Sequence, residues 1–203
     1  MLTPGLCAAT AISRGLALAR IARVGSSMVV ESERVTFRAY QPSDYEPVAA
    51  LWTRINRELA PPGMEEVFER YIAATIDGEL KQLLQIFSEA KRNAFWVVEA
   101  TNGIVGSFGI ERRTESDTEL RRMYLDRDHR GLGIAQRMLE HAQARARTLG
   151  FTKMILSTAE IQAAAHRFYC KSGFEQVRVE IAETMTTKQA GAGLTRFHFE
   201  KRL

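Results

Sequence analysis

The 203-residue sequence predicts a single α/β domain in which a mixed central sheet is covered by helices. Hydrophobic residues make up 45% and charged residues 26%, which is the balance of an ordinary soluble globular protein. No Pro, Gly or Ser stretch separates two folding units, and the length suffices for one substantial core. The predicted elements combine an antiparallel meander with a β-α-β crossover, which indicates the mixed sheet.

Residues 1–27 differ from the rest of the chain, because they are rich in Ala, Leu and Arg and contain no acidic residue. Such a composition resembles an organelle-targeting peptide, but we favour an extension upstream of a true start at Met28. In either case we expect a poorly ordered leader followed by one domain at 28–203. Two cysteines, Cys7 and Cys170, are too few for a disulfide framework, so we expect a cytoplasmic protein.

The charge pattern does not predict a nucleic-acid-binding protein. The net charge is +4, and three arginines of residues 1–27 account for three of these charges, which leaves +1 for the remainder. Binding to phosphates requires a clustered basic face, and the sequence has none. No stretch approaches the roughly 20 apolar residues that span a bilayer, so no membrane partner is expected.

The first half of the domain predicts one strand followed by helices. Residues 35–40 are typical of a strand, and Ser43 or Asp44 then offers an oxygen that caps a helix to about Asn56. A Pro-Pro-Gly breaker follows, and apolar residues then recur twice at helical spacing. These two further helices are predicted at 64–72 and 80–87, divided near Gly78.

A β-hairpin is predicted next, because two apolar runs at 95–98 and 104–108 flank Asn102-Gly103. This dipeptide is a strong hairpin signal, since both residues tolerate positive φ. A third strand at 119–125 lacks a clean two-residue alternation. A bulge near Arg121 or Arg122 would restore it.

The second half alternates helices and strands. An apolar stripe predicts a helix from Gly133 to Leu149 that ends at Gly150, and a second helix ends at Gly173. Each of these helices lies between two predicted strands in the sequence, so the helices form the crossover connections of the sheet. The predicted strands are 154–156, 174–180 and 195–203, and a Gly-rich loop joins the last two.

The segment Arg130-Gly131-Leu132-Gly133 at a strand-to-helix junction predicts an anion cradle. Glycines let backbone N–H groups approach an anion, and the helix that follows directs its positive dipole end to the same place. A pyrophosphate fits such a cradle, although the same turn also serves merely to pack a strand on a helix. A dinucleotide fold would need glycine instead of Gln136, and a nucleoside triphosphate loop would need Gly-Lys-Ser/Thr.

Three segments in order resemble the GNAT superfamily of N-acetyltransferases. Residues 130–135, Arg-Gly-Leu-Gly-Ile-Ala, match its Arg/Gln-x-x-Gly-x-Gly/Ala signature directly after a strand that resembles its bulged central strand. Residues 165–174 are similar to its Ala-x-x-x-Tyr-x-x-x-Gly-Phe segment. Gln162 stands where many members carry Asn, which resembles the camello-like subset. The resemblance extends over 35–203, and its discriminating motifs lie in 119–174.

The resemblance implies a mostly antiparallel sheet with a bulged central strand and helices on both faces. It also implies acetyl-CoA as acyl donor. No metal is expected, because the four histidines are scattered and the two cysteines share no metal-ligand spacing. The pantetheine arm would pair along the bulged strand, and the pyrophosphate would bind the glycine turn, with the Arg130 side chain adding a charge-assisted contact. The implied cofactor-binding residues are Met123, Tyr124, Leu125, Arg130, Gly131, Leu132, Gly133, Ile134, Ala135, Gln162 and Tyr169.

Two catalytic groups are predicted. An alkylammonium with a pKa of about 10.4 must lose a proton before it attacks a thioester, so a base is required. Glu119 matches a carboxylate position of the family and is the first candidate for the base. If it is not the base, Glu119 is a solvated residue at the end of its strand. Glu111 is the second candidate. Tyr169 is the expected proton donor to the leaving thiolate. Its spacing places it next to the buried face of its helix, not on that face. The alternative is an ordinary, partly buried tyrosine without a catalytic role.

We therefore expect acetyl transfer from acetyl-CoA to a primary amine in a ternary complex. A non-catalytic acyl-CoA sensor of the same fold is the alternative, and a nucleotide-binding protein is a second one. The acceptor is left open among a small amine, an amino-acid conjugate and a protein amine. Acidic residues at 65–79 would suit a cationic amine, although solvated helix faces explain them equally well. The family often forms dimers, so a homodimer is allowed.

Overall fold

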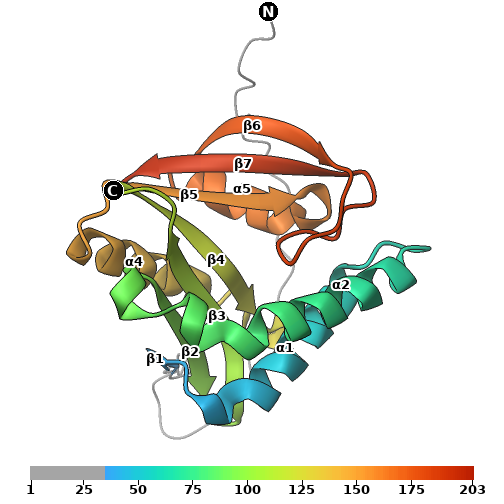
Figure 1. Ribbon diagram of the computed structural model, residues 1–203, viewed down its shortest axis with the longest axis horizontal. Coiled ribbons are helices and arrows are strands. Elements are labelled where there is room, and N and C mark those ends of the chain that lie inside the picture. Colours follow the sequence, from blue (N-terminus) through green and yellow to red (C-terminus); the bar gives the residue numbers. More distant parts are fainter. Residues whose placement is uncertain (1–34) are drawn as a thin grey trace, which may run out of the picture.

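The computed structural model describes residues 35–203 and shows a seven-stranded sheet with helices packed on it (Figure 1). The strand order is β1-β2-β3-β4-β5-β7-β6, and of the described strands only β4 and β5 pair in parallel. The expected leader at 1–27 lies outside the described residues. The mixed, mostly antiparallel sheet is confirmed. Its strands are β1 (Thr36–Ala39), β2 (Ala94–Ala100), β3 (Gly103–Arg112), β4 (Asp117–Leu125), β5 (Lys153–Ala159), β6 (Glu175–Ala182) and β7 (Leu194–Arg202).

The helices form at the predicted places, but the second runs on to Gly78 instead of ending at 72, and the segment at 80–87 differs in type. That segment forms a 3₁₀ turn followed by a single α-helical turn instead of one continuous helix. The first helix is longer than expected and ends at Leu59. The helices are α1 (Tyr45–Leu59), α2 (Glu65–Gly78), α3 (Leu83–Ile86), α4 (Ile134–Thr148) and α5 (Ala163–Lys171), and the 3₁₀ turns are η1 (Pro42–Asp44), η2 (Leu80–Gln82), η3 (Glu89–Lys91), η4 (Arg127–His129) and η5 (Glu160–Gln162).

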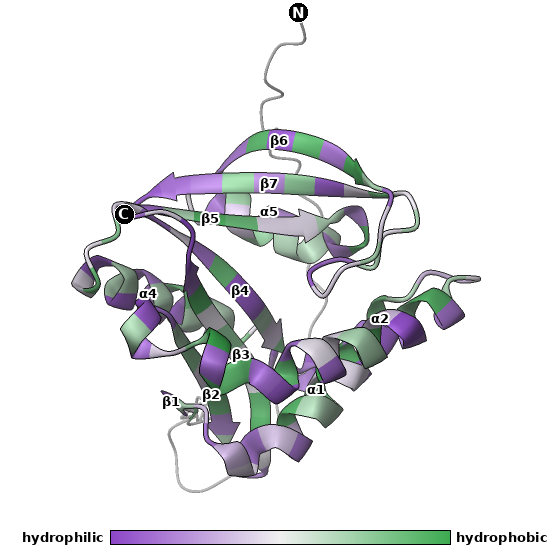
Figure 2. Ribbon diagram, in the orientation of Figure 1, coloured by the Kyte–Doolittle hydropathy of each residue, from purple (hydrophilic) through white to green (hydrophobic). Residues whose placement is uncertain are grey.

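Helices cover both faces of the sheet, as the alternation along β2 shows. Phe95 and Val97 lie in the core cluster formed with α1, whereas Trp96 and Val98 lie in the cluster formed with α4. Successive side chains of a strand point to opposite faces, so α1 and α4 pack on opposite sides. Because both faces are covered, most residues of β2 and of the middle of β3 are buried, and the middle parts of these ribbons are mostly green in Figure 2.

The β2–β3 hairpin is confirmed, but its turn is displaced by one residue from the prediction. Ala100 pairs with Gly103, so Thr101 and Asn102 form the turn. Gly103, with φ +115°, is the first residue of β3 and has the only positive φ near this turn among the described residues. The glycine is therefore needed at the start of the strand rather than inside the turn.

The predicted bulge is present in β4 at Arg122. The register passes from Gly109 opposite Arg121 to Ser107 opposite Tyr124, and Arg122 adopts the left-handed region with φ +51°. Pairing between β4 and β5 is limited to Asp117–Glu119 on the β4 side. Beyond that point the two strands diverge, as Figure 1 shows.

Candidate active site

A cavity of about 130 Å³ lies where β4 and β5 diverge. Its walls come from β4, the end of β5 and α5, together with α1, α2 and the loop between β6 and β7. The divergence leaves the β5-facing backbone edge of β4 unpaired after Glu119, so extended ligands have peptide groups to pair with. The volume is below the roughly 300 Å³ of a typical ligand pocket, which suits a small reacting group.

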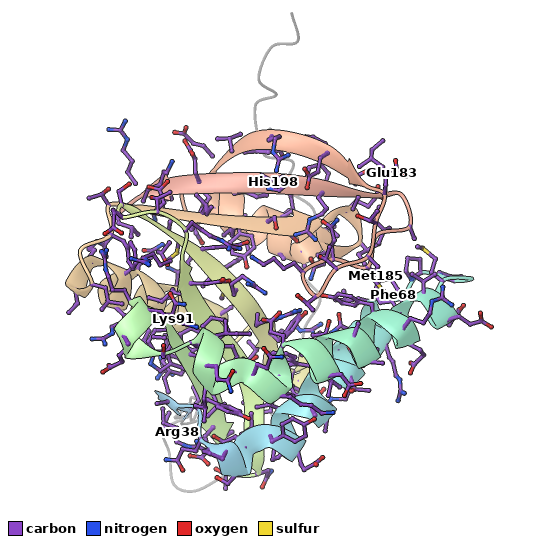
Figure 3. The ribbon with its side chains drawn as sticks, viewed as in Figure 1. Arg38, Phe68, Lys91, Glu183, Met185 and His198 are labelled. Carbon is purple, nitrogen blue, oxygen red and sulfur yellow. The ribbon has the colours of Figure 1, made fainter. Side chains whose placement is uncertain are left out.

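The loop between β6 and β7 covers this cavity from the side of α2. Figure 3 shows Phe68 of α2 and Met185 of the loop at the same end of the molecule. Phe68 packs in one cluster with Ala190 and Leu194, and Thr75 Oγ1 donates a hydrogen bond to the Thr187 carbonyl at 3.5 Å. The shape of the cavity therefore depends on how this loop is seated on α2.

Two buried side chains hold the bulge of β4 in place. Ser107 Oγ donates a hydrogen bond to the Arg122 carbonyl at 3.1 Å and accepts one from Trp52 Nε1 at 2.9 Å. A positive φ costs a non-glycine residue about 1–2 kcal/mol, and these bonds offset part of that cost. The bulge is thus tied through Trp52 to α1.

A buried ion network surrounds the bulge, and the sequence analysis did not identify it. Glu79, only 3% exposed, accepts hydrogen bonds from Arg121 at 2.8 Å and from Arg122 at 2.6 and 3.0 Å. Arg122 also donates to the hydroxyls of Tyr71 at 3.0 Å and Tyr124 at 3.3 Å. Two consecutive arginines between the apolar residues Leu120 and Met123 were the available sequence signal, because buried guanidinium groups require partners.

Tyr169 is the most buried residue of α5, on the face that packs against the sheet. The prediction placed it one step round from that face; it is wrong on this point, because the ring packs against Phe174 at 5.7 Å and Phe199 at 6.2 Å. Its hydroxyl lies 3.8 Å from Met123 Sδ. Burial, reinforced by the nearby Tyr124, raises the pKa of Tyr169, so the phenol stays protonated and is able to donate a proton.

Glu119 lines the cavity and is not a solvated strand-end residue, since its side chain is 13% exposed. It stands directly opposite Glu111 on β3, and like charges in that register repel each other. Arg113 and Lys188 lie between the two carboxylates; Arg113 donates to Glu119 at 2.7 Å, and Lys188 Nζ lies 3.2 Å from it. Glu111, which pairs with Arg121, does not line the cavity.

The glycine turn precedes α4 and has the geometry of an anion cradle. Gly131 and Gly133 have φ of +80° and +78°, and a Cβ placed on either residue would meet only open space. The first helical hydrogen bond runs from Arg137 N to Gly133 O, so the N–H groups of Ile134 and Ala135 have no partner within the helix. An open cradle with unpaired N–H groups at a helix start fits a pyrophosphate. Leu132, between the glycines, is exposed.

The Arg130 side chain turns away from this cradle. Its Nε donates to the Leu125 carbonyl at 2.9 Å, and its Nη2 lies 3.5 Å from the Glu58 carboxylate on α1. A contact with a pyrophosphate would require the guanidinium to leave Glu58. Because this ion pair is largely exposed, breaking it costs little.

The remaining predicted residues divide between the cavity and the core. Met123 and Tyr124 line the cavity, with the Tyr124 ring 6.0 Å from Trp52, whereas Leu125 packs into the core on the α4 side. Gln162 also lines the cavity, and its Oε1 accepts from Thr158 Oγ1 at 2.8 Å and from the Ala159 N–H at 3.1 Å. Gln162 therefore fixes the turn between β5 and α5.

The structure thus brings Glu119, Met123, Tyr124, Gln162 and Tyr169 to one cavity, while the glycine turn at 130–135 lies outside its lining. Several polar residues of the lining were not predicted as site residues: two lie in the predicted bulge but were given no role there, and the others are remote in sequence from the recognised motifs. These are Asn56, Tyr71, Arg121, Arg122, Lys188 and Arg196.

Residues 35–203 contain no group of three or more His, Cys, Asp and Glu side chains that could hold a metal ion. Within the same described range, every helix is too short or too polar to cross a membrane.

Comparison with known proteins gives one family. The acetyltransferase (GNAT) family matches residues 50–174. The protein named "Probable N-acetyltransferase camello" of Xenopus tropicalis is 30% identical over 125 residues, which cover 61% of this chain and 57% of that protein. N-acetylaspartate synthetase of Rattus norvegicus is 25% identical over 147 residues, 66% of this chain and 49% of that protein. The chain therefore spans about half the length of these curated relatives.

The fold is also similar to solved structures. The crystal structure of the PaiA N-acetyltransferase of Thermoplasma acidophilum in complex with coenzyme A superposes with a TM-score of 0.66. The sequence identity is 19%, and the match covers 84% of this chain and 99% of that one. At this identity the similarity establishes the fold, which agrees with the sheet, bulge and helices described above.

Proposed function

Because this chain belongs to the acetyltransferase (GNAT) family, we propose that it is an N-acetyltransferase that moves the acetyl group of acetyl-CoA to a primary amine by direct attack in a ternary complex. One observation carries the proposal: Tyr169 and Glu119, from α5 and β4, line the same cavity where β4 and β5 diverge. A proton donor and a proton acceptor are thus available at one place. Aminolysis of a thioester needs both.

Acetyl-CoA binding is supported at two places. The open glycine turn at the start of α4 suits the pyrophosphate, and the unpaired edge of β4 beyond Glu119 suits the amides of the pantetheine arm. Met123, half-buried beside Tyr169, lies on that edge. The thioester would then lie near the Tyr169 hydroxyl.

Glu119 is the proposed base, acting directly or through water. Of the described residues that line the cavity, it is the only carboxylate, which favours it over Glu111. It takes one proton from the acceptor ammonium, and the free amine attacks the thioester carbonyl. Arg113 and Lys188 hold the carboxylate in place by ion pairs.

Tyr169 is the proposed acid. As the new C–N bond forms and the C–S bond breaks, the thiolate takes the phenolic proton. The phenolate then recovers a proton from the acceptor nitrogen, which gives up its second proton. For an ammonium acceptor the products are the amide, the free thiol of CoA and one proton. The raised pKa of Tyr169 makes recovery of the proton favourable.

Thermal unfolding with acetyl-CoA, with ATP as control, tests the cofactor without knowledge of the acceptor. At about 100 times Kd the ligand stabilises the folded state by roughly 2.7 kcal/mol, which corresponds to a rise in Tm of about 5–10 °C. Release of free thiol in the presence of an amine panel then tests catalysis. Stabilisation without thiol release from any amine would indicate the acyl-CoA sensor instead. An equal rise with ATP, or no rise, would contradict the cofactor.

A further inference from the structure

Arg196 is a buried cation in the wall of the cavity. It lies on β7 opposite Ala159 of β5, on the same face as Leu194, and is 9% exposed. The motifs of the sequence analysis do not include it, and the proposed proton transfers do not use it. An arginine at an inward-facing position of a strand needs an explanation, because burying a guanidinium is costly.

The protein supplies only neutral partners to this guanidinium. Its Nη1 donates to the Lys188 carbonyl at 3.2 Å, and its Nη2 donates to Ser157 Oγ. No carboxylate within residues 35–203 lies at salt-bridge distance, 4.0 Å or less, from Arg196. Two of its five N–H groups are thus used by described residues, and the remainder of the fork is open to an acceptor.

The carboxylates whose fields reach Arg196 are already paired with other cations. Glu119 is held by Arg113 and Lys188, and Glu180 is held by Arg178 and also lies 2.9 Å from His198 Nε2. Burial lowers the pKa of Arg196, as expected for a charge that lacks a close counterion. The nearby buried arginines Arg121 and Arg122 differ, because both bind Glu79 directly.

The cavity as a whole has a surplus of positive charge. Four cations and one carboxylate line it, and the ion pairs behind the lining add one cation and two carboxylates. Five cations therefore face three carboxylates, which leaves two positive charges uncompensated. The cations are Arg113, Arg121, Arg122, Lys188 and Arg196, and the carboxylates are Glu79, Glu111 and Glu119.

We propose that Arg196 binds a carboxylate of the acceptor, so that the acceptor is a small amine that also carries a carboxylate, such as an amino acid or its conjugate. This inference rests on the proposed function. A guanidinium binds a carboxylate through two parallel hydrogen bonds, and in a cavity that excludes water such a pair is both strong and oriented. Glu119 lines the same cavity, so a compact acceptor held at Arg196 would have its amine near the proposed base.

Cationic polyamines do not suit this cavity. Of the acidic residues at 65–79 that the sequence offered for a cationic amine, none lines the cavity. Glu69 pairs with Arg57 and Asp77 with Lys81 at the surface, and Glu79 is occupied by Arg121 and Arg122. A polycation would meet the two uncompensated positive charges, whereas a carboxylate neutralises one of them. The name of the rat relative, N-acetylaspartate synthetase, is consistent with a carboxylate-bearing amine.

Matched pairs of acceptors test the proposal on the unmodified full chain. Thiol release from acetyl-CoA is measured with amino acids, with the amines obtained by removing their carboxylate, with their amides, and with spermidine. We expect kcat/KM to be at least about tenfold higher for each amino acid than for its decarboxylated or amide counterpart. Equal or faster turnover of the decarboxylated amines or of spermidine would overturn the inference and leave the proposed function standing.

A chain that acetylates no amine in the panel would instead overturn the proposed function. In that case a binding experiment still tests whether Arg196 binds a carboxylate. Thermal unfolding is measured with CoA present, with each amino acid and with its decarboxylated counterpart. Stabilisation by the carboxylate compounds alone supports a carboxylate site, and equal stabilisation or none by both members of each pair contradicts it.

The variant Arg196→Gln locates the site. It should raise KM for an amino acid by about 10- to 100-fold, while KM for acetyl-CoA and kcat/KM for the decarboxylated amine stay unchanged. Arg196→Lys should recover part of the loss, because it keeps the charge but not the fork. The ratio of kcat/KM for the amino acid to kcat/KM for the decarboxylated amine, measured in one sample, does not depend on how much of the variant is folded.

Arg178→Gln is the matched control, because Arg178 lies on the neighbouring strand β6 in an exposed pair with Glu180. It should leave the amino-acid preference as in the unmodified chain. A loss in Arg196→Gln that affected both members of a pair equally would assign Arg196 a structural role and contradict carboxylate binding.

Discussion

Tyr169 and Glu119 reach one cavity from different elements, and their surroundings suit opposite roles in proton transfer. Tyr169 is enclosed by aromatic side chains and has a thioether, Met123 Sδ, as the neighbour of its hydroxyl. Glu119 is enclosed by cations. An apolar environment keeps a phenol protonated, and the ion pairs with Arg113 and Lys188 hold the Glu119 carboxylate in one position in the cavity wall.

Replacing Tyr169 by Phe should lower kcat by about 100-fold or more, with the Kd for acetyl-CoA changed by no more than about twofold. The hydroxyl has only a weak sulfur contact to lose, so the variant should fold. Because burial raises the pKa of Tyr169, the unmodified chain should lose no activity to phenol ionisation up to about pH 10. Steady-state kinetics and calorimetry measure the two effects; an unchanged kcat would remove Tyr169 from the mechanism.

Replacing Glu119 by Gln should lower activity near pH 7 and restore it progressively as the pH rises. The reason is that an alkylamine with a pKa of about 10.4 deprotonates unaided at high pH and no longer needs the base. The pH profile of kcat/KM, measured with the same acceptor for both proteins, shows the effect. A parallel loss at every pH would instead mean that Glu119 acts in the ion network with Arg113 and Lys188.

At the scale of elements, two local irregularities leave backbone groups unpaired at the places proposed for acetyl-CoA. The bulge at Arg122 separates β4 from β5, and the glycine turn before α4 presents unpaired N–H groups. In Figure 2 the ribbon of β4 alternates between hydrophilic and hydrophobic segments along its length. Within regular strands and helices the backbone N–H and C=O groups hydrogen-bond to one another. A ligand therefore finds free backbone groups only where the regular hydrogen bonding is interrupted.

The variants Gly131→Ala and Gly133→Ala should each weaken acetyl-CoA binding by about tenfold, which is about 1.4 kcal/mol. The added methyl groups occupy the open space of the cradle, and the positive φ is strained for alanine. Gly63→Ala is the control, because Gly63 has φ +84° and open space but lies in the loop before α2. Gly63→Ala should lower Tm about as much as the two cradle variants do, because alanine is strained at all three positions, but it should not change the Kd for acetyl-CoA. An equal loss of acetyl-CoA affinity in the three variants would argue against a cradle.

At the scale of the whole molecule, one buried network joins parts that are distant in sequence. Glu79, just after α2, binds Arg121 and Arg122 of β4, and Arg122 in turn donates to the Thr187 carbonyl in the loop between β6 and β7. The helices of the first half, the central strand and the covering loop are thereby connected. The shape of the cavity and the stability of the fold depend on the same ions.

Replacing Glu79 by Gln should lower the free energy of unfolding by about 3–5 kcal/mol, because two buried arginines lose their common counterion. Asp77→Asn, two residues away, removes only an exposed pair with Lys81 and should leave stability unchanged. Urea denaturation of both variants measures the difference. Similar midpoints for the two would show that the buried network contributes little to the fold.

The sequence alone predicted the order and type of almost every element, the bulge of β4, the glycine turn and the tyrosine of α5. These features follow from local signals such as apolar periodicity, turn glycines and short motifs. It misplaced the β2–β3 turn by one residue and the face of α5 that carries Tyr169, because tertiary contacts select among neighbouring positions.

Only the tertiary structure decided which charged side chains meet. Glu79 and Arg121 are separated by 42 residues, and Lys188 and Glu119 by 69, so no local pattern predicts their pairing. Arg196 likewise became notable only once its burial and its lack of a carboxylate neighbour within residues 35–203 were known. Local backbone preferences determine elements, whereas desolvation and long-range ion pairing, which determine a binding site, exist only after the chain has folded.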